Sequence, residues 1–335
     1  MYKWNYQNKR KGALCLPKQT FDQIDAFQWV ASVQVATVWT SPDSSREIDT
    51  FGISTPTDID RWIETLSYED KLALCEDNRV QTQVLYGEQV YVTEIKGEWA
   101  HVVIPSQPSY KDKRGYPGWV PIHQLKQVDR SLWDQKKRAM VIKDKSWLTY
   151  EGKNHDFKLS YLTTLPVHDV YEDRVQVQTP HGKGYLDLSD VHIFSTSDGL
   201  EQGTGKSIVK AVEAYTGLNY FWGGMSSFGY DCSGLAYAAH KANGYLIARD
   251  AGDQANDGIE VRVDELQPGD LLFFAYQGGS GTIHHVGIYY GDGKMLHSPQ
   301  TGKGTEIIAI KDTKYEKELC TARRYWLNTE ENHNG

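Results

Sequence analysis

Two similar segments constrain the fold of the N-terminal half of the chain. GYPGWVPIHQL (115–125) and GKGYLDLSDV (182–191) each combine a Gly turn, an aromatic strand and a short polar turn. Each follows several short candidate strands that are separated by Gly and Pro turns, a pattern typical of small closed barrels. The sequence therefore predicts two copies of one small all-β barrel, over residues 32–128 and 139–195, after an N-terminal segment at 1–31.

The first barrel is expected to carry a helical insertion near residues 56–76. Thr57 or Asp58 can cap a helix there, because a short polar side chain accepts hydrogen bonds from the first free backbone N–H groups. The residues that follow place apolar side chains three and four positions apart, on one helical face: Ile59, Trp62, Ile63 and Leu66. The insertion therefore has one face suited to packing against a core.

A polar, Gly-rich stretch at 195–206 separates the barrels from a third block, expected over residues 200–328. In this block we expect helices at 206–217 and 231–244, each ending at a glycine. Strands follow, among them a hairpin at 283–299 that turns at an Asp-Gly pair. Helices followed by antiparallel strands predict an α+β domain.

Charge and composition exclude several classes of protein. The 335 residues carry a formal net charge of −8, whereas a general nucleic-acid binder needs a basic face to replace counterions. No apolar run approaches the roughly 18 residues of a membrane span, and the basic N-terminus lacks the apolar run of a secretory signal. We therefore expect no nucleic-acid partner, no membrane span and a cytoplasmic protein, or an exported one if a leader has been removed from the sequence.

The cysteines are too scattered for a disulfide framework or a zinc site: Cys15, Cys75, Cys232 and Cys320. They suit a reducing compartment, and nothing in the sequence calls for a metal or a cofactor.

Cys232 differs from the other cysteines, because it follows Asp231 at the predicted start of a helix. There the backbone N–H groups and the helix dipole stabilise a thiolate, which is the reactive nucleophile. The alternative is a buried small hydrophobic residue.

An imidazole that activates this thiol is expected among His284, His285 and His297. Strand alternation places His284 on the face of apolar Val286, and His285 on the opposite face beside Gly287, whose small size leaves room for a substrate or a helix end. His297 lies on the returning strand, where its ring can orient that of His285. Because sequence does not determine the hairpin register, ordinary polar strand positions are the alternative.

Three motifs occur in the order expected of one enzyme family: NYFWGG (219–224), DCSG (231–234) and HHVGIYYGDGKMLHS (284–298). Together they resemble the NlpC-type cysteine peptidases, bacterial enzymes that cut cell-wall peptides. The two barrels resemble the bacterial SH3 domains that accompany many such enzymes. The resemblance implies a papain-like α+β domain, in which a cysteine at a helix N-terminus packs against an antiparallel sheet that carries the histidines.

Carried over by motif, the resemblance makes Cys232 the nucleophile, His285 the general base and His297 the orienting third member. It implies that Tyr220 places its hydroxyl at the oxyanion, together with the backbone N–H of Cys232; the alternative for Tyr220 is a core aromatic. ARDAGDQ (248–254) fits the family's loop after the catalytic helix. The resemblance then implies a pocket for the substrate backbone that is lined by Asp231, Ser233, Asp250 and Ala251.

RVQTQVLYGEQV (79–90) and GYPGWVP (115–121) extend the resemblance to the γ-D-glutamyl-L-diamino acid endopeptidases, also called dipeptidyl-peptidase VI. In that subgroup the first barrel closes one end of the cleft, and an acidic residue and a tyrosine bind the free amine of the substrate's L-Ala. Tyr116 matches the tyrosine, with packing in a Gly-Pro turn as its alternative. The acidic position falls on Gln81, which accepts a hydrogen bond but supplies no charge, and Glu88 or another carboxylate can compensate.

The implied substrate is a murein peptide with a free N-terminal L-Ala, cut between D-Glu and L-Lys or diaminopimelate to release L-Ala-D-Glu. A barrel wall two residues from the nucleophile would admit only a short free end. Two other functions stay open at this point. One is a cell-wall-binding protein whose third domain is inert, and the other is an amidase or acyltransferase on the same core.

Overall fold

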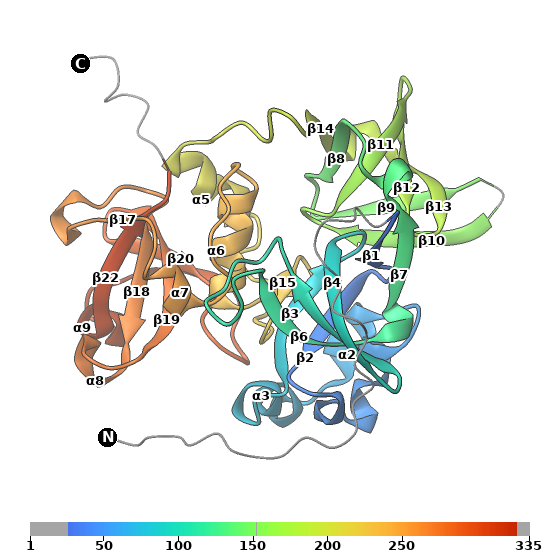
Figure 1. Cartoon of the computed structure of the whole chain (residues 1–335). Coiled ribbons are helices and arrows are strands. Elements are labelled where there is room, and N and C mark those ends of the chain that lie inside the picture. Colours follow the sequence, from blue (N-terminus) through green and yellow to red (C-terminus); the bar gives the residue numbers. More distant parts are fainter. Residues whose placement is uncertain (1–25, 152, 327–335) are drawn as a thin grey trace.

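The computed structural model describes residues 26–151 and 153–326, without the side chains of 153–156. Two small β barrels lie on one side of the molecule and an α+β domain on the other (Figure 1). Cys15 and most of the expected N-terminal segment lie outside the described residues, as do the last two residues expected in the third domain.

The first barrel is an antiparallel sheet of seven strands in the order β3-β2-β6-β5-β4-β1-β7. Its strands are β1 (Phe27–Ala31), β2 (Val35–Trp39), β3 (Val80–Leu85), β4 (Gln89–Lys96), β5 (Trp99–Ile104), β6 (Tyr116–Pro121) and β7 (Leu125–Asp129). Strand β1 pairs with both β4 and β7, and Val30 and Ala31 are buried. The barrel therefore begins before residue 32, the boundary expected from the sequence, because this short strand supplies core side chains.

The second barrel repeats the topology of the first. Its strand order, β10-β9-β13-β12-β11-β8-β14, is the same when each barrel is numbered from its own first strand. Its strands are β8 (Lys137–Val141), β9 (Lys145–Tyr150), β10 (Lys153–Ser160), β11 (Thr164–Val170), β12 (Arg174–Thr179), β13 (Gly182–Asp187) and β14 (Val191–Ser195). In both barrels a 3-10 turn, η3 (Ile122–Gln124) or η4 (Leu188–Asp190), joins the last two strands. The two similar segments of the sequence are thus equivalent pieces of one barrel type, as predicted.

The helical insertion lies between β2 and β3 and starts earlier than expected, at Pro42. Its elements are η1 (Pro42–Ser44), η2 (Glu47–Asp49), α1 (Thr50–Ile53), α2 (Ile59–Thr65) and α3 (Tyr68–Glu76). The cap of α2 is Asp58, whose side chain accepts from the backbone N–H of Arg61. A further short helix, α4 (Arg130–Trp133), connects the two barrels.

The third domain is built on a six-stranded antiparallel sheet in the order β17-β22-β18-β19-β20-β21. The sheet strands are β17 (Ile259–Glu260), β18 (Leu271–Ala275), β19 (Ile283–Gly291), β20 (Lys294–His297), β21 (Glu306–Ala309) and β22 (Leu319–Arg324). The other elements are α5 (Gly205–Glu213), the small hairpin β15 (Met225–Ser226) and β16 (Gly229–Tyr230), α6 (Cys232–Lys241), α7 (Ala251–Gln254), η5 (Val263–Glu265), α8 (Tyr276–Gly279) and α9 (Lys314–Glu318). Helix α6 packs on β19 and lies between the sheet and the barrels (Figure 1).

Strand β3 of the first barrel docks directly onto the third domain. The indole N–H of Trp222 donates to the backbone oxygen of Val80 (2.9 Å), and the side-chain oxygen of Gln83 accepts from the backbone N–H of Met225 (3.0 Å). Buried groups need such partners, so the contacts define one relative position of the two domains. No helix in the described parts of the chain is long and apolar enough to cross a membrane.

The insertion shares its core with the third domain. Trp62 is fully buried, its indole N–H donates to Asp49 (3.1 Å), and its ring meets Phe221 edge-on at 5.2 Å. One cluster of buried side chains contains both rings together with Ile208 of α5. The insertion is therefore part of the interface between the barrel and the third domain.

Replacing Trp62 should weaken this shared core. Trp62→Ala removes a fully buried indole and leaves Asp49 without one of its donors, so we expect a loss of about 3–5 kcal/mol in the free energy of unfolding. Trp147→Ala is the matched control, because that side chain is 52% exposed and its loss should cost about 0.5 kcal/mol. Chemical denaturation of both variants measures the difference, and equal losses would contradict the shared core.

Candidate active site

Cys232 is the first residue of helix α6, as the sequence predicted. The preceding Asp231 is the cap, and its carboxylate accepts from the backbone N–H of Gly234 (2.7 Å). A Cβ at Gly234 would lie 2.1 Å from the backbone oxygen of Gly224, so only glycine lets the helix start approach that loop. The DCSG motif therefore combines the cap, the thiol and the close approach that brings the preceding loop to the site.

Cys232 is half-buried, and the surroundings of its thiol favour the neutral form. Burial, and then the negative charge of Asp231, raise its pKa to about 12. Backbone N–H groups of Val286 and Ser233 and the charge of Arg249 act in the opposite direction. The resting site therefore holds a neutral thiol surrounded by groups that stabilise a thiolate when a proton acceptor is present.

His285 and His297 lie together on neighbouring strands β19 and β20. Nε2 of His285 and Nδ1 of His297 are 2.8 Å apart, and both side chains are buried. The ring of Tyr315 lies against both, with ring centroids 5.3 and 5.1 Å away. A Cβ at Gly287 would lie 2.8 Å from Met295 and 3.5 Å from Cβ of His297. The space beside Gly287, expected to receive a substrate or a helix end, is thus occupied by the returning strand.

Both imidazoles are held in the neutral form. Burial lowers the pKa of His285 well below its usual value, and the charge that His297 would carry lowers it further. Burial also lowers the pKa of His297 to about 4, with a smaller contribution from Lys314. Neutral rings suit a general base, because a base must have a free lone pair.

Glu306 lies next to this pair, a position that the sequence did not reveal. It lies on β21 directly opposite His297, and its carboxylate is 3.5 Å from Nε2 of His297. The three side chains form a row from the buried His285 outward to the half-exposed Glu306. Only the strand register brings Glu306 to the histidine, and sequence alone does not determine that register.

Tyr220 is also buried close to the thiol. Its backbone N–H donates to the backbone oxygen of Lys303 (2.9 Å), which fixes the loop ahead of α6. Burial, and then the negative charge that Cys232 would carry, raise the pKa of its hydroxyl well above the usual value. The phenol therefore stays protonated and available as a hydrogen-bond donor.

Asp231 and Ser233 meet a partner that the sequence analysis missed, Arg249. Its guanidinium donates to Asp231 (2.6 Å) and to the hydroxyl of Ser233 (2.8 Å), and its Nε donates to Thr82 of the first barrel (2.9 Å). The arginine is 1% exposed. Arg249 immediately precedes Asp250 in the ARDAGDQ loop (248–254). A buried ion pair leaves no local pattern in the sequence, so this contact was not predicted.

The barrel residues Gln81 and Tyr116 meet Asp250 of the third domain. The hydroxyl of Tyr116 is 3.1 Å from each carboxylate oxygen of Asp250 and 3.3 Å from the side-chain oxygen of Gln81. Asp250 precedes α7, which begins at Ala251, but its side chain makes no capping bond. Tyr116 is buried and belongs to the core of the first barrel, so simple exposed packing in a Gly-Pro turn does not describe it.

Glu88, the carboxylate named as a substitute for the missing acidic residue, lies elsewhere. It accepts from the backbone N–H of Leu85 (3.0 Å) and from Ser106, and it pairs with Lys241 (3.4 Å). The carboxylate beside Gln81 is therefore Asp250.

Comparisons with known proteins agree with this arrangement. Residues 217–324 match the model of the NlpC/P60 family, and residues 141–194 match that of the YKFC SH3b2 domain. A gamma-D-glutamyl-L-lysine dipeptidyl-peptidase of Bacillus subtilis is 47% identical over 290 residues, 87% of this chain and 96% of that protein. The chain belongs to the NlpC/P60 family. It is thus a cysteine peptidase of the papain-like fold, as the three motifs predicted.

Two further relatives cover nearly the whole chain. A gamma-D-glutamyl-L-lysine dipeptidyl-peptidase of Bacillus cereus is 35% identical over 300 residues, 88% of this chain and 89% of that protein. The crystal structure of an NlpC/P60 family protein from Bacillus cereus has a TM-score of 0.87 at 34% identity and covers 90% of this chain and 100% of that one. The NlpC/P60 domain and both barrels are therefore shared with these relatives as one assembly.

The neutral state of His297 predicts how stability depends on pH. Its pKa in the folded protein is about 4, against 6.5 for an ordinary histidine, so the unfolded chain takes up the proton first as pH falls. The stability that His297 contributes is therefore complete above pH 6.5 and is lost progressively down to about pH 4. His297→Asn should lose less stability than wild type over this interval, by up to about 3 kcal/mol.

Urea unfolding at pH 7 and pH 4.5 measures this effect. His192→Asn is the control, because His192 is exposed. The stability of this variant should depend on pH as that of wild type does. The same pH dependence in wild type and His297→Asn would contradict the buried neutral imidazole.

Proposed function

We propose that this enzyme cuts murein peptides that begin with a free L-Ala, at the bond between the γ-carboxyl of D-Glu and L-Lys or diaminopimelate. The product is L-Ala-D-Glu. The observation that carries the proposal is the contact of Tyr116 with Asp250. This contact puts a carboxylate, which can bind a free amine, where the first barrel meets the third domain. The names of the two Bacillus relatives, both gamma-D-glutamyl-L-lysine dipeptidyl-peptidases, support the same reaction.

The proposed setting is the recycling of free murein peptides in the cytoplasm. The three described cysteines, Cys75, Cys232 and Cys320, are free thiols, and free thiols suit a reducing compartment. A murein peptide is the proposed partner of the site.

The proposed proton path runs from the thiol to the outer carboxylate. Nε2 of His297 has no hydrogen-bond partner among the described residues, and the carboxylate of Glu306 lies 3.5 Å from it. In the proposed path Glu306 moves closer and accepts that proton, which leaves Nδ1 of His297 free to accept from Nε2 of His285. That tautomer leaves a lone pair on Nδ1 of His285, the nitrogen we assign to the thiol. His285 is then the general base, and His297 and Glu306 are positioning residues that set its tautomer.

The proposed reaction is an acyl transfer in two steps. The thiol of Cys232 gives its proton to His285 as the sulfur attacks the γ-carbonyl carbon of D-Glu. The resulting oxyanion receives hydrogen bonds from Tyr220 and from the backbone N–H of Cys232. When it collapses, the C–N bond breaks and His285 protonates the departing amine. Water then hydrolyses the thioester, with His285 taking its proton and returning a proton to the sulfur.

The proposed specificity follows from the wall formed by the barrel. The ammonium of L-Ala would face Asp250 and the hydroxyl of Tyr116, because a carboxylate attracts the charged amine. Gln81 adds an oxygen acceptor without charge. Asp231 and Ser233, held by Arg249, and Ala251 are assigned to the substrate backbone between the amine and the thiol. An acylated or sugar-linked N-terminus has no positive charge and is too bulky to fit the wall.

A small panel of peptides tests this function. Mass spectrometry should find L-Ala-D-Glu after incubation with L-Ala-γ-D-Glu-L-Lys, and much less product from the N-acetylated peptide. Cys232→Ala should release none. Binding of peptidoglycan without turnover would favour an inert binding protein, and equal cleavage of both peptides would favour an amidase. Full activity of Cys232→Ala would contradict the mechanism.

Tyr220 gives a second, independent test. Tyr220→Phe removes one oxyanion donor, so we expect kcat to fall about 100-fold with little change in KM. Tyr171→Phe on the second barrel is a control, because this exposed tyrosine should leave both constants unchanged. A Tyr220→Phe enzyme with wild-type kcat would show that Tyr220 is only a core aromatic.

A further inference from the structure

A lysine of the protein itself lies in the proposed amine subsite. The ammonium of Lys111 pairs with Asp250 (3.0 Å), donates to the side-chain oxygen of Gln81 (3.0 Å) and contacts the hydroxyl of Tyr116. It also lies 4.2 Å from the centre of the Tyr116 ring. These are the three side chains that we assign to the substrate's amine, and Lys111 contacts all of them.

We propose that Lys111 is a built-in occupant of this subsite, whose ammonium takes the place of the substrate's α-ammonium and must leave before the peptide binds. The inference rests on the proposed function, because it takes Asp250 and Tyr116 as the amine site. It adds a specificity-determining residue that competes with the substrate and makes no contact needed for the reaction.

The charges at the subsite require this competition. Asp250 is the carboxylate in contact with Lys111 and Tyr116, and Gln81 is neutral. With Lys111 in place the ion pair is already complete. A second ammonium brought to the same carboxylate would be repelled by the first, so the substrate's amine can pair with Asp250 only when Lys111 withdraws.

The position of Lys111 also allows its side chain to leave the subsite. Lys111 belongs to the loop between β5 and β6, and its side chain is 44% exposed while that of Asp250 is 33% exposed. Ion pairs this accessible to water are weak, so exchange for another ammonium costs little. The loop itself is anchored, because the backbone N–H of Tyr110 donates to Asp253 of α7 (2.9 Å). The anchored loop therefore holds Lys111 beside the subsite, while the side chain can still turn into solvent.

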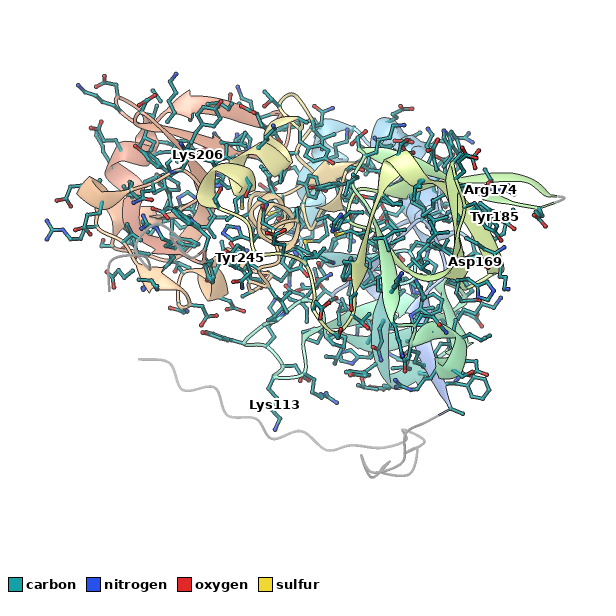
Figure 2. The ribbon with its side chains drawn as sticks, turned by 90° about the horizontal axis from the view of Figure 1, so that it is seen from above. Lys113, Asp169, Arg174, Tyr185, Lys206 and Tyr245 are labelled. Carbon is teal, nitrogen blue, oxygen red and sulfur yellow. The ribbon has the colours of Figure 1, made fainter. Side chains whose placement is uncertain are left out.

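Removing the charge of Lys111 should strengthen binding of peptides with a free amine. For Lys111→Met we expect KM for L-Ala-γ-D-Glu-L-Lys to fall about two- to fivefold with kcat unchanged, since an exposed ion pair contributes a difference of that size. The gain should shrink at high salt. Lys113→Met is the matched control: this lysine of the same loop points away from the body of the molecule (Figure 2) and should leave KM unchanged.

A binding measurement separates this inference from the proposed reaction. In the Cys232→Ala background, calorimetry with L-Ala-D-Glu should show tighter binding after Lys111→Met by the same factor, and no such gain with the N-acetylated dipeptide. If wild type cuts no stem peptide, the proposed function fails, and the calorimetric gain still decides the role of Lys111. Unchanged or weaker dipeptide binding after Lys111→Met overturns the inference, because Lys111 would then be neutral or would help the ligand.

A second substitution at the subsite sharpens the test. Gln81→Glu adds a carboxylate next to both ammonium positions. In the wild-type background Lys111 can pair with it, so dipeptide affinity should rise little. In the Lys111→Met background the same change should raise affinity clearly more. Equal effects of Gln81→Glu in both backgrounds would contradict a shared position for the two ammonium groups.

Discussion

The buried ion pair between Asp231 and Arg249 supports the rest of the site. Two charges in a dry interior are costly to bury unless their remaining hydrogen-bonding groups are satisfied. Here Asp231 also caps the helix of Cys232, and Arg249 also reaches Ser233 and Thr82. One pair of side chains therefore connects the start of the nucleophile's helix to strand β3 of the first barrel. The distance from the thiol to the barrel wall, which we propose counts two substrate residues, depends on this connection.

Burial also determines the protonation of the proposed catalytic groups. The same dry surroundings raise the pKa of the Cys232 thiol and lower those of His285 and His297, so each group is neutral at rest. A thiolate and an imidazolium formed together stabilise each other, whereas either alone is disfavoured. This links proton transfer to the attack on the substrate. In the proposed mechanism His297 and Glu306 supply the polar partners that a buried imidazolium needs.

Local patterns in the sequence predicted much of this architecture. The two similar strand-turn segments indicated two barrels of one type, and Asp231 before Cys232 indicated a capped helix with the thiol at its start. These signals work because caps, turns and strand faces depend on residues close together in the chain.

The features that the sequence did not reveal depend on residues far apart in the chain. Arg249 pairs with Asp231 and Thr82 across two domains, and Lys111 reaches Asp250 from a loop of the first barrel. Glu306 meets His297 only through the strand register. Neither a buried ion pair nor a lysine in a subsite leaves a periodic pattern. The resemblance implied that the first barrel closes one end of the cleft, but it did not indicate the contacts that hold the barrel there, which join Trp222 to Val80 and Gln83 to Met225.

The most direct test of this account is a crystal structure of Cys232→Ala with L-Ala-γ-D-Glu-L-Lys bound. The account predicts the α-ammonium against Asp250 and Tyr116, the side chain of Lys111 turned into solvent, and the γ-carbonyl of D-Glu between position 232 and the hydroxyl of Tyr220. A peptide whose amine lies away from Asp250, or whose γ-carbonyl lies out of reach of position 232, would contradict it.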